Sequence, residues 1–101
     1  METEPLKVVK NDFLRQFEVK INHKKLIRLE YSEQGKNTFL THLYVDSSVE
    51  NAAYKEQFMR QVLELLKKEE QYVVPTCPKV ASFFKKNRAE FKHLLPAGIN
   101  L

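Results

Sequence analysis

Hydrophobic and polar residues alternate along three stretches in the first half of the chain, which is the period-two pattern of half-buried strands. The first predicted strand runs over 13–21, and its apolar side consists of Phe13, Phe17, Val19 and Ile21. A short turn at 22–24 separates it from a second alternating stretch at 26–31, so we expect a hairpin. Gly35 lies in the next turn, where it can adopt a positive φ. The pattern therefore predicts an antiparallel meander that ends with a third strand at 39–45.

The third predicted strand carries large apolar residues at both odd and even positions. Strict alternation places one set on each face of the sheet, namely Phe39, Thr41, Leu43 and Val45 against Leu40, His42 and Tyr44. Because both sets contain large apolar side chains, we expect both faces to be covered and this strand to be central.

After residue 46 the apolar spacing changes to the three-to-four period of an amphipathic helix. The predicted stripe consists of Val49, Ala53, Phe58, Val62, Leu65 and Leu66. Lys67 and Lys68 follow it, where positive charge favours a helix C-terminus. Ser47 and Glu50 have the Ser-x-x-Glu spacing of a capping box, an interpretation that starts the helix near Ser48.

A brief strand and a second helix complete the pattern. Residues 71–74 have β-type composition, and Pro75 and Pro78 end that run before a helical stripe begins at Val80. The predicted element order is βββαβα. This order defines an α/β (α+β) fold class, an antiparallel strand meander followed by helix, strand and helix.

Composition narrows the class of protein without deciding its function. The chain has 101 residues, 43% of them apolar and 30% charged, which suits one domain spanning 1–101. Its single cysteine excludes an internal disulfide, no apolar run approaches the ~20 residues of a membrane helix, and the first residues are polar. We therefore expect a cytoplasmic protein without a membrane partner. The net charge of +4 favours anionic partners only mildly, and we do not expect nucleic acid among them.

Two residues could carry chemistry. His42 could act as a base or proton relay, because imidazole titrates near neutral pH, or it could be an ordinary strand histidine. Cys77 precedes a predicted helix, whose N-terminal end favours the thiolate, but a buried cysteine is also a common core residue. Tyr44 and Tyr72 could protonate a leaving thiolate or simply pack. The three histidines and one cysteine have no metal-ligand spacing, so no metal site is predicted.

Two segments resemble a known family. Residues 42–45 are similar to the His-Thr-Glu-Val stretch of small stand-alone proteins of the GNAT acetyltransferase superfamily, with His42 and Val45 matching. Residues 73–80 match the family's Val-x-Pro-x-Cys-Pro-x-Val segment more closely, and 84–94 resemble its closing helix and tail. The resemblance covers roughly 41–95. It implies a full-length, single-domain GNAT-like member with His42 and Cys77 as candidate catalytic residues.

The resemblance also implies a cofactor, acetyl-CoA. In the superfamily a turn with the pattern Gln/Arg-x-x-Gly-x-Gly/Ala holds the pyrophosphate with backbone amides at a helix N-terminus. Counting from Val45 places Glu50, Ala53 and Lys55 at the three defining positions, so none carries the expected residue. The residues that would bind the cofactor are Val45, Asn51, Ala52, Ala53, Tyr54 and Lys55.

Weak nucleic-acid binding through Lys24, Lys25, Lys85, Lys86 and Arg88 is the least favoured of three hypotheses. Two others rank above it. The first is acetyl-CoA-dependent transfer of an acetyl group to a primary amine of an unknown acceptor. The alternative is a noncatalytic binding module that has the GNAT fold and an altered cofactor turn.

Overall fold

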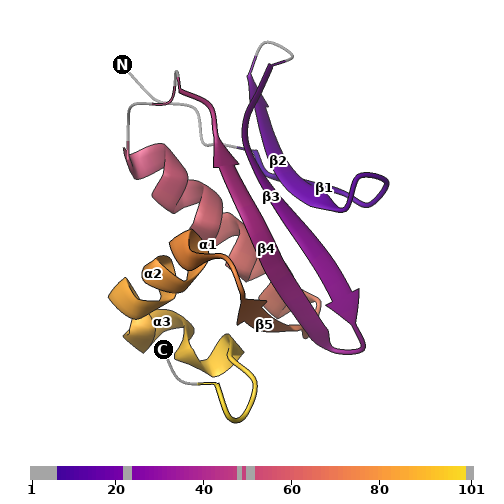
Figure 1. Ribbon diagram of the computed structural model, residues 1–101, viewed down its shortest axis with the longest axis vertical. Coiled ribbons are helices and arrows are strands. Elements are labelled where there is room, and N and C mark those ends of the chain that lie inside the picture. The colour runs from indigo at the N-terminus through magenta and orange to yellow at the C-terminus, as the bar shows by residue number, and fades with distance from the viewer. Residues whose placement is uncertain (1–6, 22–23, 48, 50–51, 100–101) are drawn as a thin grey trace.

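The computed structural model of the protein describes residues 7–21, 24–47, 49 and 52–99 (Figure 1). Five strands form one sheet in the order β1-β2-β3-β4-β5. The first four are antiparallel neighbours, and β5 pairs in parallel with β4. The strands are β1 (Val9–Asn11), β2 (Gln16–Ile21), β3 (Lys24–Gln34), β4 (Asn37–Val45) and β5 (Tyr72–Pro75). The helices are α1 (Ala52–Lys68), α2 (Pro78–Lys86), α3 (Arg88–Phe91) and the 3₁₀ turn η1 (Lys92–Leu94).

The predicted fold class is confirmed, because a meander is followed by helix, strand and helix. Gly35 has a φ of 60°, as its turn position predicted. The first two strands differ from the prediction. Strand β1 was not expected, and β2 begins at Gln16. Phe13 lies in the turn between these strands and is 93% exposed. The side-chain oxygen of Asn11 accepts a hydrogen bond from the Leu14 amide (3.0 Å), which closes this turn and removes Phe13 from the strand.

One hydrophobic cluster joins the sheet to the helices. Phe17 and Leu29 from the sheet belong to the same cluster as five buried residues of α1, which are Phe58, Met59, Val62, Leu63 and Leu66. These residues lie at helical spacing, so α1 covers one face of the sheet. Figure 1 shows α2 and α3 beside α1, and Phe84 extends the cluster into α2. No helix within these described residues is long and apolar enough to cross a membrane.

A bulge in β4 changes which residues of that strand face the core. Glu30 of β3 pairs with His42 and the next residue pairs with Leu40, so Thr41 is an extra residue on β4. The Thr41 hydroxyl donates to the Glu30 carbonyl (3.2 Å). The expected strict alternation is therefore wrong. Leu40 and Leu43 are both buried, whereas His42 and Tyr44 are exposed to solvent.

Helix α1 spans Ala52–Lys68, and Val49 before it is not helical. The predicted start near Ser48 lies outside the described residues. The proposed capping box involves Glu50, which lies outside the described residues. At the other end, Lys67 and Lys68 occupy the last turn as predicted. Glu70 follows the helix with a φ of 57°. The Gln71 amide bonds to the Leu66 carbonyl and the Glu70 amide to the Lys67 carbonyl, which is the Schellman arrangement that favours glycine.

Glu70→Gly is expected to stabilise the protein by about 1 kcal/mol, because glycine adopts the left-handed conformation without the steric cost that glutamate carries. For a domain of this size, that gain corresponds to a rise in Tm of about 4–8 °C in thermal unfolding. Lys68→Gly, in the last helical turn, serves as the control and should lower Tm instead. An unchanged or lower Tm for Glu70→Gly would contradict the interpretation.

Candidate functional site

Strands β4 and β5 separate immediately after Leu40. Their parallel pairing covers only 37–40 and 72–75. The Leu40 carbonyl accepts hydrogen bonds from the amides of Thr76 (3.2 Å) and Cys77 (3.1 Å) and from the Thr76 hydroxyl (3.1 Å). These bonds hold the chain where it turns from β5 into α2. Among the described residues, the edge of β4 from Thr41 to Val45 therefore has no strand neighbour on that side.

Cys77 lies where the two strands separate, at the N-cap position of α2, and its side chain is 7% exposed. Burial raises the pKa of this thiol. The backbone amides of Val80, Leu43 and Lys79, together with the positive charge of Lys79, lower the pKa by more than burial raises it. The net pKa is below that of an ordinary cysteine, although the sulfur makes no hydrogen bond of cap geometry with α2. The predicted position at a helix start is confirmed. The environment favours the thiolate, which is the nucleophilic form.

His42 is on the exposed face of β4, next to Glu30 of β3. Its Nδ1 lies 3.3 Å from the Glu30 Oε1, and its side chain is 65% exposed. The Tyr44 ring stacks near the imidazole, with ring centroids 6.3 Å apart. The guanidinium of Arg28 covers that tyrosine at 3.9 Å and lies 3.5 Å from Glu30. A carboxylate at Nδ1 orients the ring and leaves Nε2 directed toward solvent, where it can accept a proton.

The structure does not bring His42 and Cys77 into contact. No hydrogen bond, ion pair or ring contact between them exists in the described part of the chain. The residue between the two sites is Leu43. Its amide faces the sulfur, whereas the neighbouring imidazole lies on the opposite, open face of the strand. Any chemistry that uses both groups therefore requires a substrate or a water molecule that extends around the edge of β4.

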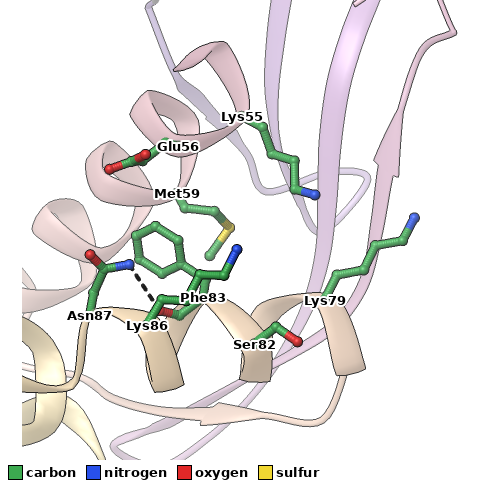
Figure 2. A pocket seen from close by; sticks show the side chains of 8 residues that line it. All are labelled: Lys55, Glu56, Met59, Lys79, Ser82, Phe83, Lys86 and Asn87. Atoms are coloured by element: carbon green, nitrogen blue, oxygen red, sulfur yellow. Dashed lines mark hydrogen bonds between the residues drawn. The ribbon is translucent and has the colours of Figure 1, made fainter. Parts of the chain in front are cut away.

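A groove of about 190 Å³ lies between α1 and α2 (Figure 2). Its wall consists of Lys55, Glu56, Met59, Lys79, Ser82, Phe83, Lys86 and Asn87. Three of these eight residues are lysines and one is acidic. The acidic residue, Glu56, is bonded to Arg60, which also bonds Glu90. The groove therefore carries an excess of positive charge, which suits an anionic ligand.

Only part of the predicted cofactor-binding set lies at this groove. Lys55 lines it directly. Tyr54 packs against the core, Ala53 is exposed and Val45 is half-buried at the end of β4. Ala52 is the first residue of α1, and Asn51 lies outside the described residues. The cofactor roles of all six residues remain predictions.

The α2 side of the groove was not predicted from the sequence. Lys79, Ser82, Phe83 and Lys86 follow the i, i+3, i+4, i+7 spacing of one helix face. That spacing could have identified them as neighbours. It could not have shown that this face lies opposite Lys55 of α1. Within the described ranges, no three His, Cys, Asp or Glu side chains are placed to hold a metal ion.

The meander that leads into α1, followed by a parallel strand that separates from β4, defines a fold of the GNAT type. The sequence model of the family described as GCN5-related N-acetyl-transferase matches residues 16–94. The chain therefore belongs to this family. The solution NMR structure of a GCN5-like protein from Staphylococcus aureus is similar, with a TM-score of 0.71 and 12% identity over 97% of this chain and 94% of that chain. At that identity the similarity shows the fold alone. None of the curated proteins matches the sequence.

The pKa of Cys77 can be measured from the absorbance of its thiolate near 240 nm as pH rises. We expect a midpoint below that of an ordinary thiol, because the amides and Lys79 stabilise the anion. Lys79→Gln should move the midpoint upward. Lys85→Gln on the same helix is the control and should leave it unchanged, and Cys77→Ser should abolish the signal. A wild-type midpoint at or above the ordinary value would show that burial dominates.

Proposed function

We propose that this protein binds acetyl-CoA and transfers its acetyl group to a primary amine. The observation that carries the proposal is the position of Cys77, buried where β4 and β5 separate and surrounded by amides that favour its thiolate. Membership of the GCN5-related N-acetyl-transferase family supports acetyl transfer as the type of reaction. The positively charged groove beside α2 supports an anionic co-substrate.

In the proposed reaction, the Cys77 thiolate attacks the carbonyl carbon of the acetyl thioester. The bond between that carbon and the CoA sulfur breaks, and CoA leaves as a thiolate. The acetyl group then passes from Sγ to a neutral amine, which loses one proton as the amide bond forms. His42 accepts that proton through a water molecule at the edge of β4, and the carboxylate of Glu30 beside Nδ1 holds the ring in place.

A second candidate function is a noncatalytic binding module with this fold. The observation that favours it is the altered turn before and within the start of α1. There Ala53 and Lys55 occupy positions where the family pattern has residues that let a backbone approach a phosphate closely. Such a module would bind a ligand or partner without transferring an acetyl group.

Calorimetric titration with CoA and acetyl-CoA, together with an acetylation assay on a panel of amines, tests the two candidates. We expect binding and turnover in the wild type. Cys77→Ser should abolish turnover, and His42→Ala should lower kcat/KM by about 10²-fold or more, because a general base contributes at least that much.

His93→Ala is the matched control. This histidine is exposed in η1, so its replacement should leave binding and kcat/KM unchanged. Circular dichroism of every variant separates loss of chemistry from loss of folding. Absence of binding at millimolar concentrations of either ligand would reject the enzymatic proposal. Turnover that Cys77→Ser abolishes and His42→Ala lowers, with the fold intact, would reject the noncatalytic one.

A further inference from the structure

The hairpin of β1 and β2 exposes apolar side chains that the core does not use. In the part of the chain that the structure describes, five large hydrophobic side chains are exposed, and three of them, Val9, Phe13 and Leu14, lie within six residues. Single exposed apolar residues are normal on a protein surface, whereas a cluster of them marks an interaction site. We infer that two copies of this chain form a two-fold dimer, in which the β1–β2 turn of each copy enters a groove between β1 and α1 of the other.

The β1–β2 turn, residues 12–15, holds Phe13 outward in a fixed conformation. Tyr31 of β3 bonds both sides of the turn, since its hydroxyl donates to Asp12 (2.8 Å) and its amide donates to the Arg15 carbonyl (3.0 Å). Tyr31 is buried, so these bonds anchor the turn to the core. Figure 1 shows the turn projecting from the edge of the sheet, away from α2 and α3. A preformed turn loses little conformational entropy when it binds, which favours association.

A groove that can receive a phenyl ring lies beside the same strand. Its volume is about 290 Å³, and its wall consists of Val8, Arg60, Gln61, Glu64, Leu65 and Lys68. Val8 and Leu65 pack against the hydrophobic core and give the groove an apolar surface. Small-molecule pockets have volumes of about 300 Å³ or more, so a single aromatic side chain suits this groove better than a cofactor does.

The groove and the turn lie at opposite ends of β1, and this arrangement favours a second copy of the chain as the partner. Val8 precedes the strand and Phe13 follows it. Phe13 is 93% exposed, so it does not fill the groove of its own copy. A two-fold axis beside β1 exchanges the two ends, so each turn meets the other copy's groove and two equal contacts form. Strand β1 is an edge strand, which leaves this side of the sheet accessible.

Charges around the turn and the groove are complementary. Asp12 and Arg15 flank Phe13, whereas Glu64 and Lys68 lie one helical turn apart on the rim of the groove. Arg15, Glu64 and Lys68 form no ion pair within the described ranges. In the dimer, Arg15 pairs with Glu64 of the partner subunit and Asp12 with Lys68 of the partner subunit. The reverse orientation would bring like charges together, so these pairs fix the orientation of the turn.

Analytical ultracentrifugation over a range of protein concentrations tests the dimer. We expect the wild type to show a reversible monomer–dimer equilibrium in the micromolar range. Phe13→Ala should raise the dissociation constant by about 10²-fold or more, because each dimer loses two buried phenyl groups and each is worth at least about tenfold. Tyr72→Ala removes another exposed aromatic ring that lies outside both surfaces, so this control should leave the dissociation constant unchanged.

Charge reversal identifies the surface that receives the turn. Arg15→Glu and Glu64→Arg should each weaken association by about tenfold, because like charges then face each other at both contacts. The double variant should restore the wild-type dissociation constant, since opposite charges face each other again. Only a partner that carries both substitutions, which is a second copy of the same chain, can produce this rescue.

Thermal unfolding separates association from folding. The Tm of the wild type should rise with protein concentration, because a dimer stabilises the folded state by mass action. Phe13→Ala should remove this dependence. At low concentration it should leave Tm unchanged, because the phenyl group is exposed in the monomer.

Three outcomes would overturn the dimer. The first is a wild type that stays monomeric up to about 1 mM, where even weak self-association is measurable. The second is a dimer that Phe13→Ala leaves intact, and the third is a double charge reversal that does not restore association. None of these outcomes bears on acetyl transfer, because neither surface contains His42 or Cys77.

Discussion

The Leu40 carbonyl oxygen accepts hydrogen bonds from three donors, and the geometry of the candidate site depends on this interaction. The two amides and one hydroxyl come from the residues that leave β5, so parallel pairing ends there and α2 begins within two residues. The same bonds place Cys77 beside the amide of Leu43 and the first turn of α2. In a sheet whose two strands continued side by side, the ladder would use that amide, and the thiol would lose a group that stabilises its anion.

The open edge of β4 and the α1–α2 groove belong to the same part of the molecule because Lys79 contributes to both. Its ammonium group lines the groove, and its charge lowers the pKa of Cys77. One side chain thus links the place where an anion would bind to the place where a thioester would react. A ligand that neutralises Lys79 would also weaken its effect on the thiol. An anion bound in the groove would therefore be coupled electrostatically to the reactivity of the thiol.

The sequence predicted the elements well and their fine geometry poorly. Alternation located β2 and β3 because Phe17 and Val19 of β2 and Ile27, Leu29 and Tyr31 of β3 are buried at every second position. The register shift between these strands follows Val19 and so lies beyond those residues. It failed at Phe13, where the side-chain hydrogen bond of Asn11 outweighs the apolar pattern, and at β4, where one inserted residue at Thr41 shifts the period. Cys77 could be found because proline and helix signals surround it. The groove could not, because it depends on how two helices pack and not on either helix alone.

The bulge at Thr41 divides β4 into two segments that are subject to different constraints. Residues before it pair on both sides and contribute Leu40 to the core, so substitutions there act mainly on folding. Residues after it pair with β3 alone. Leu43 still belongs to the core, but His42 and Tyr44 face solvent, so substitutions at those two positions act mainly on what the surface can bind. The exposed positions of the second segment can therefore vary while the first segment keeps the sheet intact. One inserted residue thus separates the part of β4 that is constrained by folding from side chains that are not.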